Sequence, residues 1–164
     1  MNIDGMEIER KFLIAMPDKA TLERAHSSEI VQTYLKGEKG TTERVRKRSA
    51  DGESVYTHTV KRRISAMRRQ EDERGISRAE YEELLRRADP KRRNVHKTRY
   101  CLSYEGQLFE IDVYPFWKDR AIMEIELDSE QREVALPPFI KVIKEVTEDG
   151  RYTNAALAKE VPAT

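Results

Sequence analysis

The sequence of 164 residues contains one cysteine, Cys101, and no long apolar segment. One cysteine cannot form an internal disulfide, which favours a reducing compartment, so we expect a cytoplasmic protein. No stretch approaches the roughly 18 apolar residues of a transmembrane helix, and the N-terminus lacks the apolar run of a signal peptide. We therefore expect no membrane partner. Internal repeats, linkers and low-complexity tracts are also absent, which predicts one domain over residues 1–164.

A surplus of charge of one sign is missing as well. The 31 basic and 30 acidic side chains leave a net charge of +1, whereas a nucleic-acid-binding protein usually carries a clear basic excess. We therefore expect no nucleic-acid partner. Only 3 histidines are present, which argues against a histidine-based zinc site. Charged residues nevertheless make up 37 % of the chain, against about 25 % in a typical domain, and this predicts a partly polar interior.

Alternating apolar residues and turn dipeptides predict eight strands, two pairs of which form hairpins at Asp51-Gly52 and Glu105-Gly106. The predicted strands are residues 6–14, 30–37, 41–50, 53–63, 66–74, 94–104, 107–116 and 120–128. Helices are predicted at 17–26, at 77–88, in a short segment that begins at Pro137, and at 154–160. Ser77 and Glu80 form a capping box for the second of these helices. So many hairpin-connected strands predict an α+β fold with an eight-stranded antiparallel β-barrel and helices outside it and at one end.

Charged side chains stand two residues apart on six of the predicted strands, and positions two apart share one face of a strand. The acidic pairs are Glu7 and Glu9, Glu71 and Glu73, Glu110 and Asp112, and Glu124 and Glu126. The basic residues on the same faces are Lys11, Arg44, Arg46, Lys61, Lys97 and Arg99. For any one strand, a solvated outer face explains such a pattern. Its repetition on six segments, with the signs separated by strand, favours a charged barrel interior.

The acidic and the basic side chains would bind different parts of one ligand, a metal ion and a phosphate chain. Carboxylates two apart suit Mg²⁺ or Mn²⁺, which take oxygen ligands, while arginine and lysine bind phosphate oxygens. Six cations exceed what a monophosphate needs, so the pattern predicts a tunnel for a metal-bound polyphosphate. Because an isolated buried charge is costly, we expect the bases to pair with the acids. Hydrolysis would then proceed by in-line attack of water with no covalent enzyme intermediate.

The ordered set of charges resembles the CYTH superfamily, also called triphosphate tunnel metalloenzymes. Glu7, Glu9 and Lys11 match its N-terminal ExExK signature, and the segment 145–154 is similar to its C-terminal region. The remaining matches, in chain order, are Arg44 and Arg46, Lys61, Glu71 and Glu73, Lys97 and Arg99, Asp112, and Glu124 and Glu126. The resemblance covers residues 6–159. It implies a tunnel fold, a metal cofactor and a small-molecule triphosphate substrate.

Within the superfamily the chain resembles the short bacterial members that are similar to inorganic tripolyphosphatases. That resemblance implies a catalytic dyad of Lys11 and Tyr34, although the second strand reads QTYL where QGYL is usual. We expect neighbouring cations to lower the pKa of Lys11, so that it helps take a proton from the attacking water; the alternative is that Lys11 only pairs with Glu7 or Glu9. We assign metal binding to Glu7, Glu9, Glu124 and Glu126, and secondarily to Glu71, Glu73 and Asp112.

The predicted function is Mg²⁺- or Mn²⁺-dependent hydrolysis of inorganic tripolyphosphate to pyrophosphate and phosphate. Other members of the superfamily make cyclic AMP from ATP or hydrolyse thiamine triphosphate, and the tunnel residues do not separate these activities. Both alternatives require recognition of an organic group, for which the sequence offers no evident aromatic pocket. A non-catalytic module that binds polyphosphate or nucleotides is the alternative from another class. A homodimer is compatible with the sequence.

Overall fold

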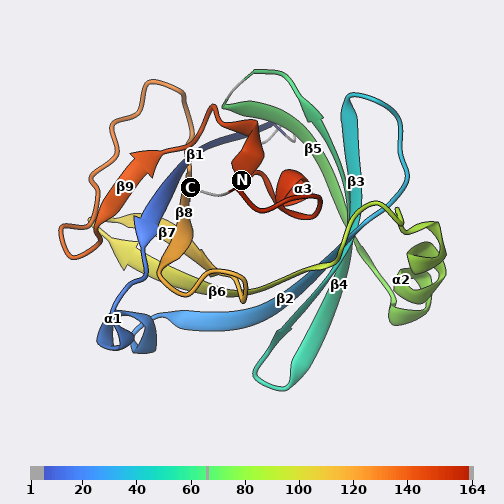
Figure 1. Cartoon of the computed structure of the whole chain (residues 1–164), viewed down its shortest axis with the longest axis horizontal. Helices are drawn as coiled ribbons and strands as arrows, with labels where there is room; N and C mark the ends of the chain where they lie inside the picture. Colours follow the sequence, from blue (N-terminus) through green and yellow to red (C-terminus); the bar gives the residue numbers. More distant parts are fainter. Residues whose placement is uncertain (1–5, 66, 163–164) are drawn as a thin grey trace.

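The strands of the chain close into an antiparallel barrel (Figure 1). The computed structural model describes residues 6–65 and 67–162. Around the barrel the strand order is β5-β4-β3-β2-β6-β7-β8-β1, and pairing of β5 with β1 completes the ring. The strands are β1 (Met6–Ala15), β2 (His26–Tyr34), β3 (Thr41–Ala50), β4 (Glu53–Arg63), β5 (Arg68–Ile76), β6 (Val95–Tyr104), β7 (Gln107–Val113), β8 (Arg120–Glu126) and β9 (Val142–Glu145). The predicted α+β class and eight-stranded antiparallel barrel are confirmed.

The two predicted hairpin turns are present. Asp51 and Gly52 have φ of 53° and 80°, and Glu105 and Gly106 have φ of 51° and 71°. Positive φ at both central residues is typical of the two-residue turn that matches the twist of antiparallel strands. The turn residues therefore fix the register of β3 with β4 and of β6 with β7.

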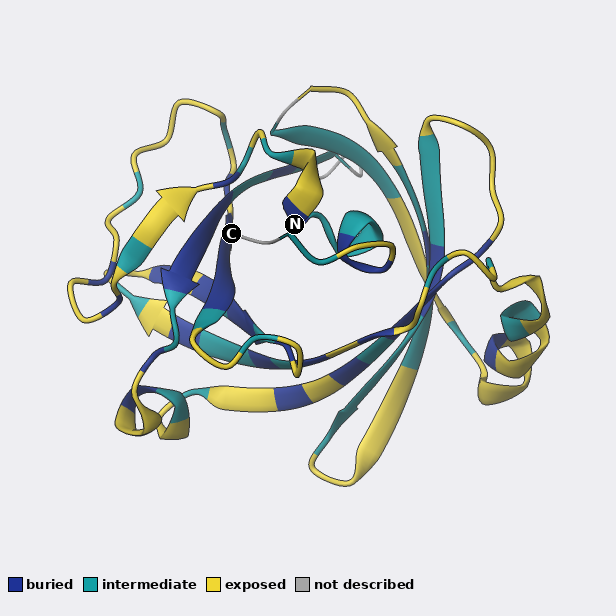
Figure 2. Ribbon diagram, in the orientation of Figure 1, coloured by how far each residue is buried: buried dark blue, intermediate teal, exposed yellow. Residues whose placement is uncertain are grey.

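The apolar faces of several strands lie on the outside of the barrel, because the charged faces point inward. Ile8, Phe12 and Ile14 of β1 pack in an outer cluster with Met123 and Ile125 of β8. The segment that follows β8 covers this cluster, and Figure 2 shows the long buried stretches of β1 and β8. Complete burial of a large apolar side chain contributes about 1.5–3 kcal/mol. The outer cluster thus provides much of the stabilisation by apolar burial that the charged interior of the barrel cannot provide.

A second apolar cluster closes one end of the barrel interior. Leu13 and Ile122 pair across β1 and β8 and pack with Tyr34, Tyr152 and Leu157. The last two residues belong to the C-terminal elements η2 (Gly150–Tyr152) and α3 (Asn154–Leu157), which Figure 1 shows within the ring of strands. These elements cover one end of the interior and leave the charged region beyond them.

The remaining helices lie outside the ring: α1 (Lys19–Glu23), and α2 (Arg78–Leu84) followed by η1 (Leu85–Arg87). The Ser77 side chain accepts a hydrogen bond from the Glu80 backbone N–H, which confirms the N-cap half of the predicted capping box. The Glu80 carboxylate accepts a hydrogen bond from Arg74 at 3.1 Å. Tyr81 of α2 packs on Val45 of β3. No helix within the described residues is long and apolar enough to span a membrane.

Some predicted boundaries were wrong. The first helix ends at Glu23 and β2 begins at His26, because Ser28 and Ile30 alternate as buried residues of that strand. The segment after Pro137 is not helical; Ile140 packs in the outer cluster, and the chain then forms β9, which was not predicted. The predicted fifth strand is shifted to 68–76, and its predicted residue 66 lies outside the described residues.

Candidate active site

Cross-strand register places the predicted charged residues on one inner surface. Glu126 lies opposite Glu9, and Glu124 lies opposite Lys11. On the other side of the barrel Tyr34 lies opposite Arg44. Because directly opposed residues share a face of the sheet, these side chains all point into the barrel.

The inward side chains surround a cavity of about 750 Å³. This volume falls within the roughly 300–1,000 Å³ of small-molecule sites. The predicted site residues that line the cavity are Glu7, Glu9, Lys11, Tyr34, Arg44, Arg46, Lys61, Glu71, Glu73, Arg99, Glu124 and Glu126. Acids and bases from six strands, together with Tyr34 of β2, therefore meet in one space.

One wall of the cavity is rich in arginine. The Nε atoms of Arg44 and Arg46 are buried and have no hydrogen-bond partner. Burial and the neighbouring charges of Arg44 and Arg99 lower the pKa of Arg46 to about 10. Burial also opposes the charged form of Arg44, but Tyr34, Glu71 and Glu73 outweigh it and raise its pKa. Of these two arginines, Arg46 is thus the one whose charge its neighbours do not neutralise. The unpartnered donors point to an anionic ligand.

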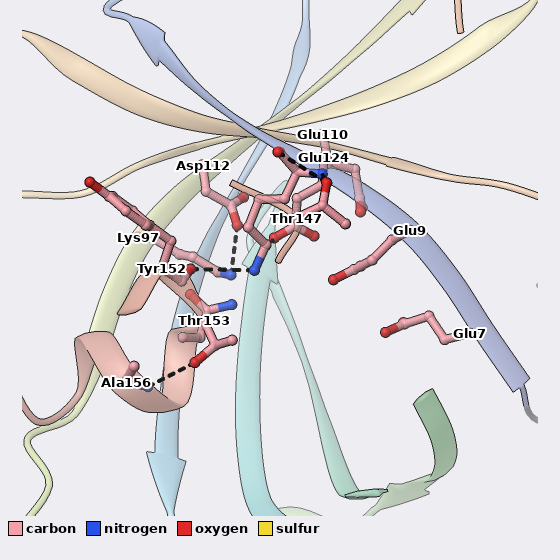
Figure 3. A network of polar contacts seen from close by, with 12 residues as sticks. Glu7, Glu9, Lys97, Glu110, Asp112, Glu124, Thr147, Tyr152, Thr153 and Ala156 are labelled. Atoms are coloured by element: carbon pink, nitrogen blue, oxygen red, sulfur yellow. Dashed lines mark hydrogen bonds and ion pairs between the residues drawn. The ribbon is translucent and has the colours of Figure 1, made fainter. Parts of the chain in front are cut away.

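The carboxylates of the cavity crowd one another. Burial and the charge of Glu124 raise the pKa of Glu9 to about 7. Burial and the neighbouring Glu71 raise the pKa of Glu7, and burial together with Glu7 raises that of Glu126. Figure 3 shows Glu7 and Glu9 projecting from β1 in the region of Glu110 and Glu124. Mutual repulsion among oxygen ligands is relieved by a hard divalent cation, so these residues fit such an ion.

Ion pairs link the acids to the bases, as predicted for buried charges. Lys61 Nζ lies 3.1 Å from Glu7 and 3.7 Å from Glu71, and Lys11 Nζ lies 3.4 Å from Glu124. Within residues 6–65 and 67–162, no three Asp, Glu, His or Cys side chains already converge as a metal site. The carboxylates are instead engaged by cations that a metal and a polyanion would have to displace.

Lys11 and Tyr34 line the same cavity but have different partners. Lys11 Nζ donates to the backbone oxygen of Tyr152 at 3.3 Å, and Gln32 Nε2 donates to the Tyr34 hydroxyl at 3.0 Å. Burial opposes the charged form of Lys11, but Glu124 and Glu9 outweigh it and raise its pKa. The expected lowering of the Lys11 pKa is therefore wrong, because acids rather than cations dominate its surroundings.

Lys97 and Asp112 do not line the cavity. Both side chains are fully buried, and Lys97 Nζ lies 2.7 Å from Asp112 Oδ2. Arg99 also donates to Asp112, from Nε at 2.8 Å and from Nη2 at 3.0 Å. Burial alone would raise the pKa of Asp112, but Lys97 and Arg99 hold it well below its usual range. This carboxylate is saturated by cations beneath the wall that Arg99 forms.

Several residues that line the cavity were not assigned to the site from the sequence. Arg48 shares the face of Arg44 and Arg46, and Glu110 shares the face of Asp112, so the alternation of each strand already indicated them. Thr153 and Asn154 also line the cavity. No sequence signal indicated these two, because their position depends on where α3 enters the barrel.

Comparison with known proteins places this arrangement in a family. The model of the CYTH domain matches residues 5–152. An inorganic triphosphatase from Nitrosomonas europaea is 36% identical over 167 residues, covering 95% of this chain and 99% of that protein. A crystal structure of an inorganic triphosphatase is 34% identical, with a TM-score of 0.60 and coverage of 95% of this chain and 96% of the other.

A putative adenylate cyclase from Bacillus halodurans shares the fold at 20% identity, with a TM-score of 0.51 and coverage of 77% of this chain and 83% of that one. At this identity the likeness extends to the fold alone. The family model, in contrast, matches nearly the whole barrel and includes both charged walls of the cavity. The chain belongs to the CYTH domain family.

Proposed function

We propose that this protein hydrolyses inorganic tripolyphosphate to pyrophosphate and phosphate in a metal-dependent reaction, with the whole chain acting as one tunnel domain. The observation that carries the proposal is the pair of unpartnered arginine donors, at Arg44 and Arg46, in a cavity that also holds crowded carboxylates. A polyphosphate would accept hydrogen bonds from the arginine donors, and its metal ion would neutralise the crowded carboxylates. The 36% identity to an inorganic triphosphatase supports the same substrate.

The cations of the chain would bind and orient the polyphosphate. Arg44 and Arg46 can each contact phosphate oxygens through two nitrogens, whereas Lys61 acts as a compact charge. Arg99 lines the cavity and donates to Asp112, whereas Lys97 pairs with the same carboxylate but does not line the cavity. Only Arg99 of these two could therefore contact the polyphosphate directly. Fixed charges of this kind stabilise the negative charge that shifts to the leaving phosphate in the transition state.

The acids would hold the metal, which we propose to be Mg²⁺ or Mn²⁺. Glu7, Glu9, Glu124 and Glu126 are the first candidates as ligands, and Glu71 and Glu73 are the second. When bound, such an ion supplies Lewis-acid charge beside the phosphoryl oxygens and lowers the pKa of a bound water. Asp112 is the remaining sequence candidate, and its two cationic partners favour a role in the wall. The sole cysteine supports a cytoplasmic location.

Lys11 and Tyr34 remain the proposed catalytic residues. Because Glu124 and Glu9 keep Lys11 protonated, its role would be to stabilise charge on the phosphoryl oxygens rather than to accept a proton. Tyr34 adjoins Arg44, its neighbour across β2 and β3. Both side chains therefore face the region in which a phosphoryl group would lie.

A phosphate-release assay with tripolyphosphate, ATP and thiamine triphosphate, with and without Mg²⁺ or Mn²⁺, tests the proposed function. Among the Phe, Tyr and Trp residues that the structure describes, only Tyr34 lines the cavity, and the imidazole of His58 is held by Glu43 at 2.6 Å. Neither nucleotide nor thiamine therefore has an evident stacking site. We expect metal-dependent turnover of tripolyphosphate above that of the other two. Binding without turnover of any of them would instead identify a polyphosphate-binding module.

Replacement of Arg46 by alanine is expected to raise the Michaelis constant for tripolyphosphate more than it lowers turnover. Phosphate binding acts in both the ground and transition states, and one charge-assisted contact corresponds to about 10- to 100-fold in affinity. Steady-state kinetics measure the effect. Arg62→Ala removes an exposed arginine from the neighbouring β4 and serves as the control. An unchanged Michaelis constant in Arg46→Ala would contradict the role.

Combined replacement of Lys11 and Tyr34 tests whether the two residues serve one step. Lys11→Ala and Tyr34→Phe should each lower turnover, and the double variant should lose little more than the worse single variant. The measurement is the turnover number of all four proteins at saturating substrate. Fully additive losses would assign the residues to separate roles, and an unaltered Tyr34→Phe enzyme would remove the tyrosine from the mechanism.

A further inference from the structure

Arg48 is the third arginine on the inner face of β3. It follows Arg44 and Arg46 at the same two-residue spacing, and it lines the cavity. Positions two apart on a strand are separated by about 7 Å. The three guanidinium groups therefore form a row of cations along one strand.

The hydrogen-bond partners of Arg48 are neutral, unlike the ion-pair partners of Arg46 and Arg99. Arg48 Nε donates to Ser28 Oγ at 2.9 Å, and its Nη2 lies 4.0 Å from Cys101 Sγ. Arg46 has Glu73 at 3.7 Å, and Arg99 has both Glu110 and Asp112.

In the described part of the chain, no carboxylate lies within ion-pair distance of Arg48. Its charge instead adds to the repulsion on Arg46. Ser28 is buried and directs the Nε side of the guanidinium toward the wall of the barrel. Arg48 is thus a positioned cation that lacks an anion.

The row of arginines has one covered end. Arg44 lies opposite Tyr34, which packs with Tyr152 and Leu157 of the C-terminal elements. A phosphate chain bound by Arg44 and Arg46 could not extend past this cluster. It could extend in the opposite direction, where Arg48 pairs across the sheet with Ile30 and Val55.

We propose that Arg48 forms an additional phosphoryl subsite, which binds the fourth phosphoryl group of an inorganic polyphosphate longer than tripolyphosphate. This inference rests on the proposed function, because it extends the same row of phosphate contacts. Successive phosphoryl groups are closer together than successive arginines on the strand, so tripolyphosphate is shorter than the row of three arginines. Each added phosphoryl group extends the chain along this row toward Arg48. The subsite makes Arg48 a determinant of substrate length.

The test compares binding of inorganic tripolyphosphate and tetrapolyphosphate by calorimetry, together with phosphate release, in the full-length protein. Arg48→Gln should weaken tetrapolyphosphate binding about tenfold more than tripolyphosphate binding, which corresponds to the loss of one charged contact. Arg48→Lys keeps a positive charge and should restore part of the difference. Lys47→Gln removes the neighbouring charge on the outer face of β3 and should leave both affinities unchanged.

Equal weakening for both polyphosphates, or no weakening for either, would overturn the subsite. Should Arg48→Gln fold poorly, Ser28→Ala is the second test. It frees the guanidinium from its acceptor without removing the charge, so it should change the affinity for tetrapolyphosphate and leave that for tripolyphosphate unchanged. Failure of the proposed function has a different signature. In that case the wild-type protein would release no phosphate from either compound, whereas the difference between the two binding affinities could still be measured.

Discussion

Replacement of Glu9 by glutamine is expected to abolish most phosphate release while the protein stays folded. Glutamine keeps the shape of the side chain but removes a charge that a hard cation requires, and we expect turnover to fall about 100-fold or more. Glu9 lies among like charges, chiefly Glu124, so loss of its charge relieves repulsion in the interior. The melting temperature without metal should therefore equal or exceed that of the wild type.

Metal-induced stabilisation gives a second measurement for Glu9 that does not depend on activity. A ligand that binds only the folded state raises the melting temperature, so Mg²⁺ or Mn²⁺ should stabilise the wild type and have less effect on Glu9→Gln. Glu53→Gln changes an exposed carboxylate at the start of β4 and serves as the control. Full activity of Glu9→Gln at ordinary metal concentration would remove Glu9 from the metal site.

The inner face of the barrel could be predicted from the sequence because strand alternation is a local property. Glu7, Glu9 and Lys11 needed only the period of two to be placed together, and the turn dipeptides predicted two pairs of neighbouring strands, β3 with β4 and β6 with β7. The charged lining was therefore accessible before any contact was known. The same rule already contained Arg48, which shares the face of Arg46.

Depth along the barrel could not be predicted in the same way. Lys97 and Asp112 lie on the inner face of their strands, as predicted. They are, however, beside the apolar cluster at the covered end of the barrel, where they form an ion pair with each other. The position of a residue along the barrel axis depends on the stagger of all strands, which no single strand encodes. The strand β9 was missed for a related reason, because it exists through pairing with the edge of β1 that β5 leaves uncovered.

Replacement of Asp112 by asparagine is expected to destabilise the fold rather than to act mainly on the chemistry. The variant would leave the buried Arg99 cation without this anion. Burial already lowers the pKa of Lys97 to about 7 beside Asp112, so without Asp112 this lysine would lose its proton and its ion pair. Removal of one partner from a buried ion pair costs about 3–5 kcal/mol. In a domain of this size each kcal/mol lowers the melting temperature by about 2–4 °C. Thermal and urea unfolding at neutral pH measure the loss.

The pH dependence and a surface control complete this prediction. Lys97 and Arg99 hold the pKa of Asp112 below its unfolded value, against the effect of burial, so its stabilising contribution is present above pH 3.8 and is lost only in stronger acid. The deficit of Asp112→Asn should accordingly persist across neutral pH. Asp119→Asn removes an exposed ion pair with Arg120 and should cost at most about 1 kcal/mol. If Asp112→Asn instead keeps wild-type stability and loses metal-induced stabilisation, Asp112 is a metal ligand, and the assignment to the wall fails.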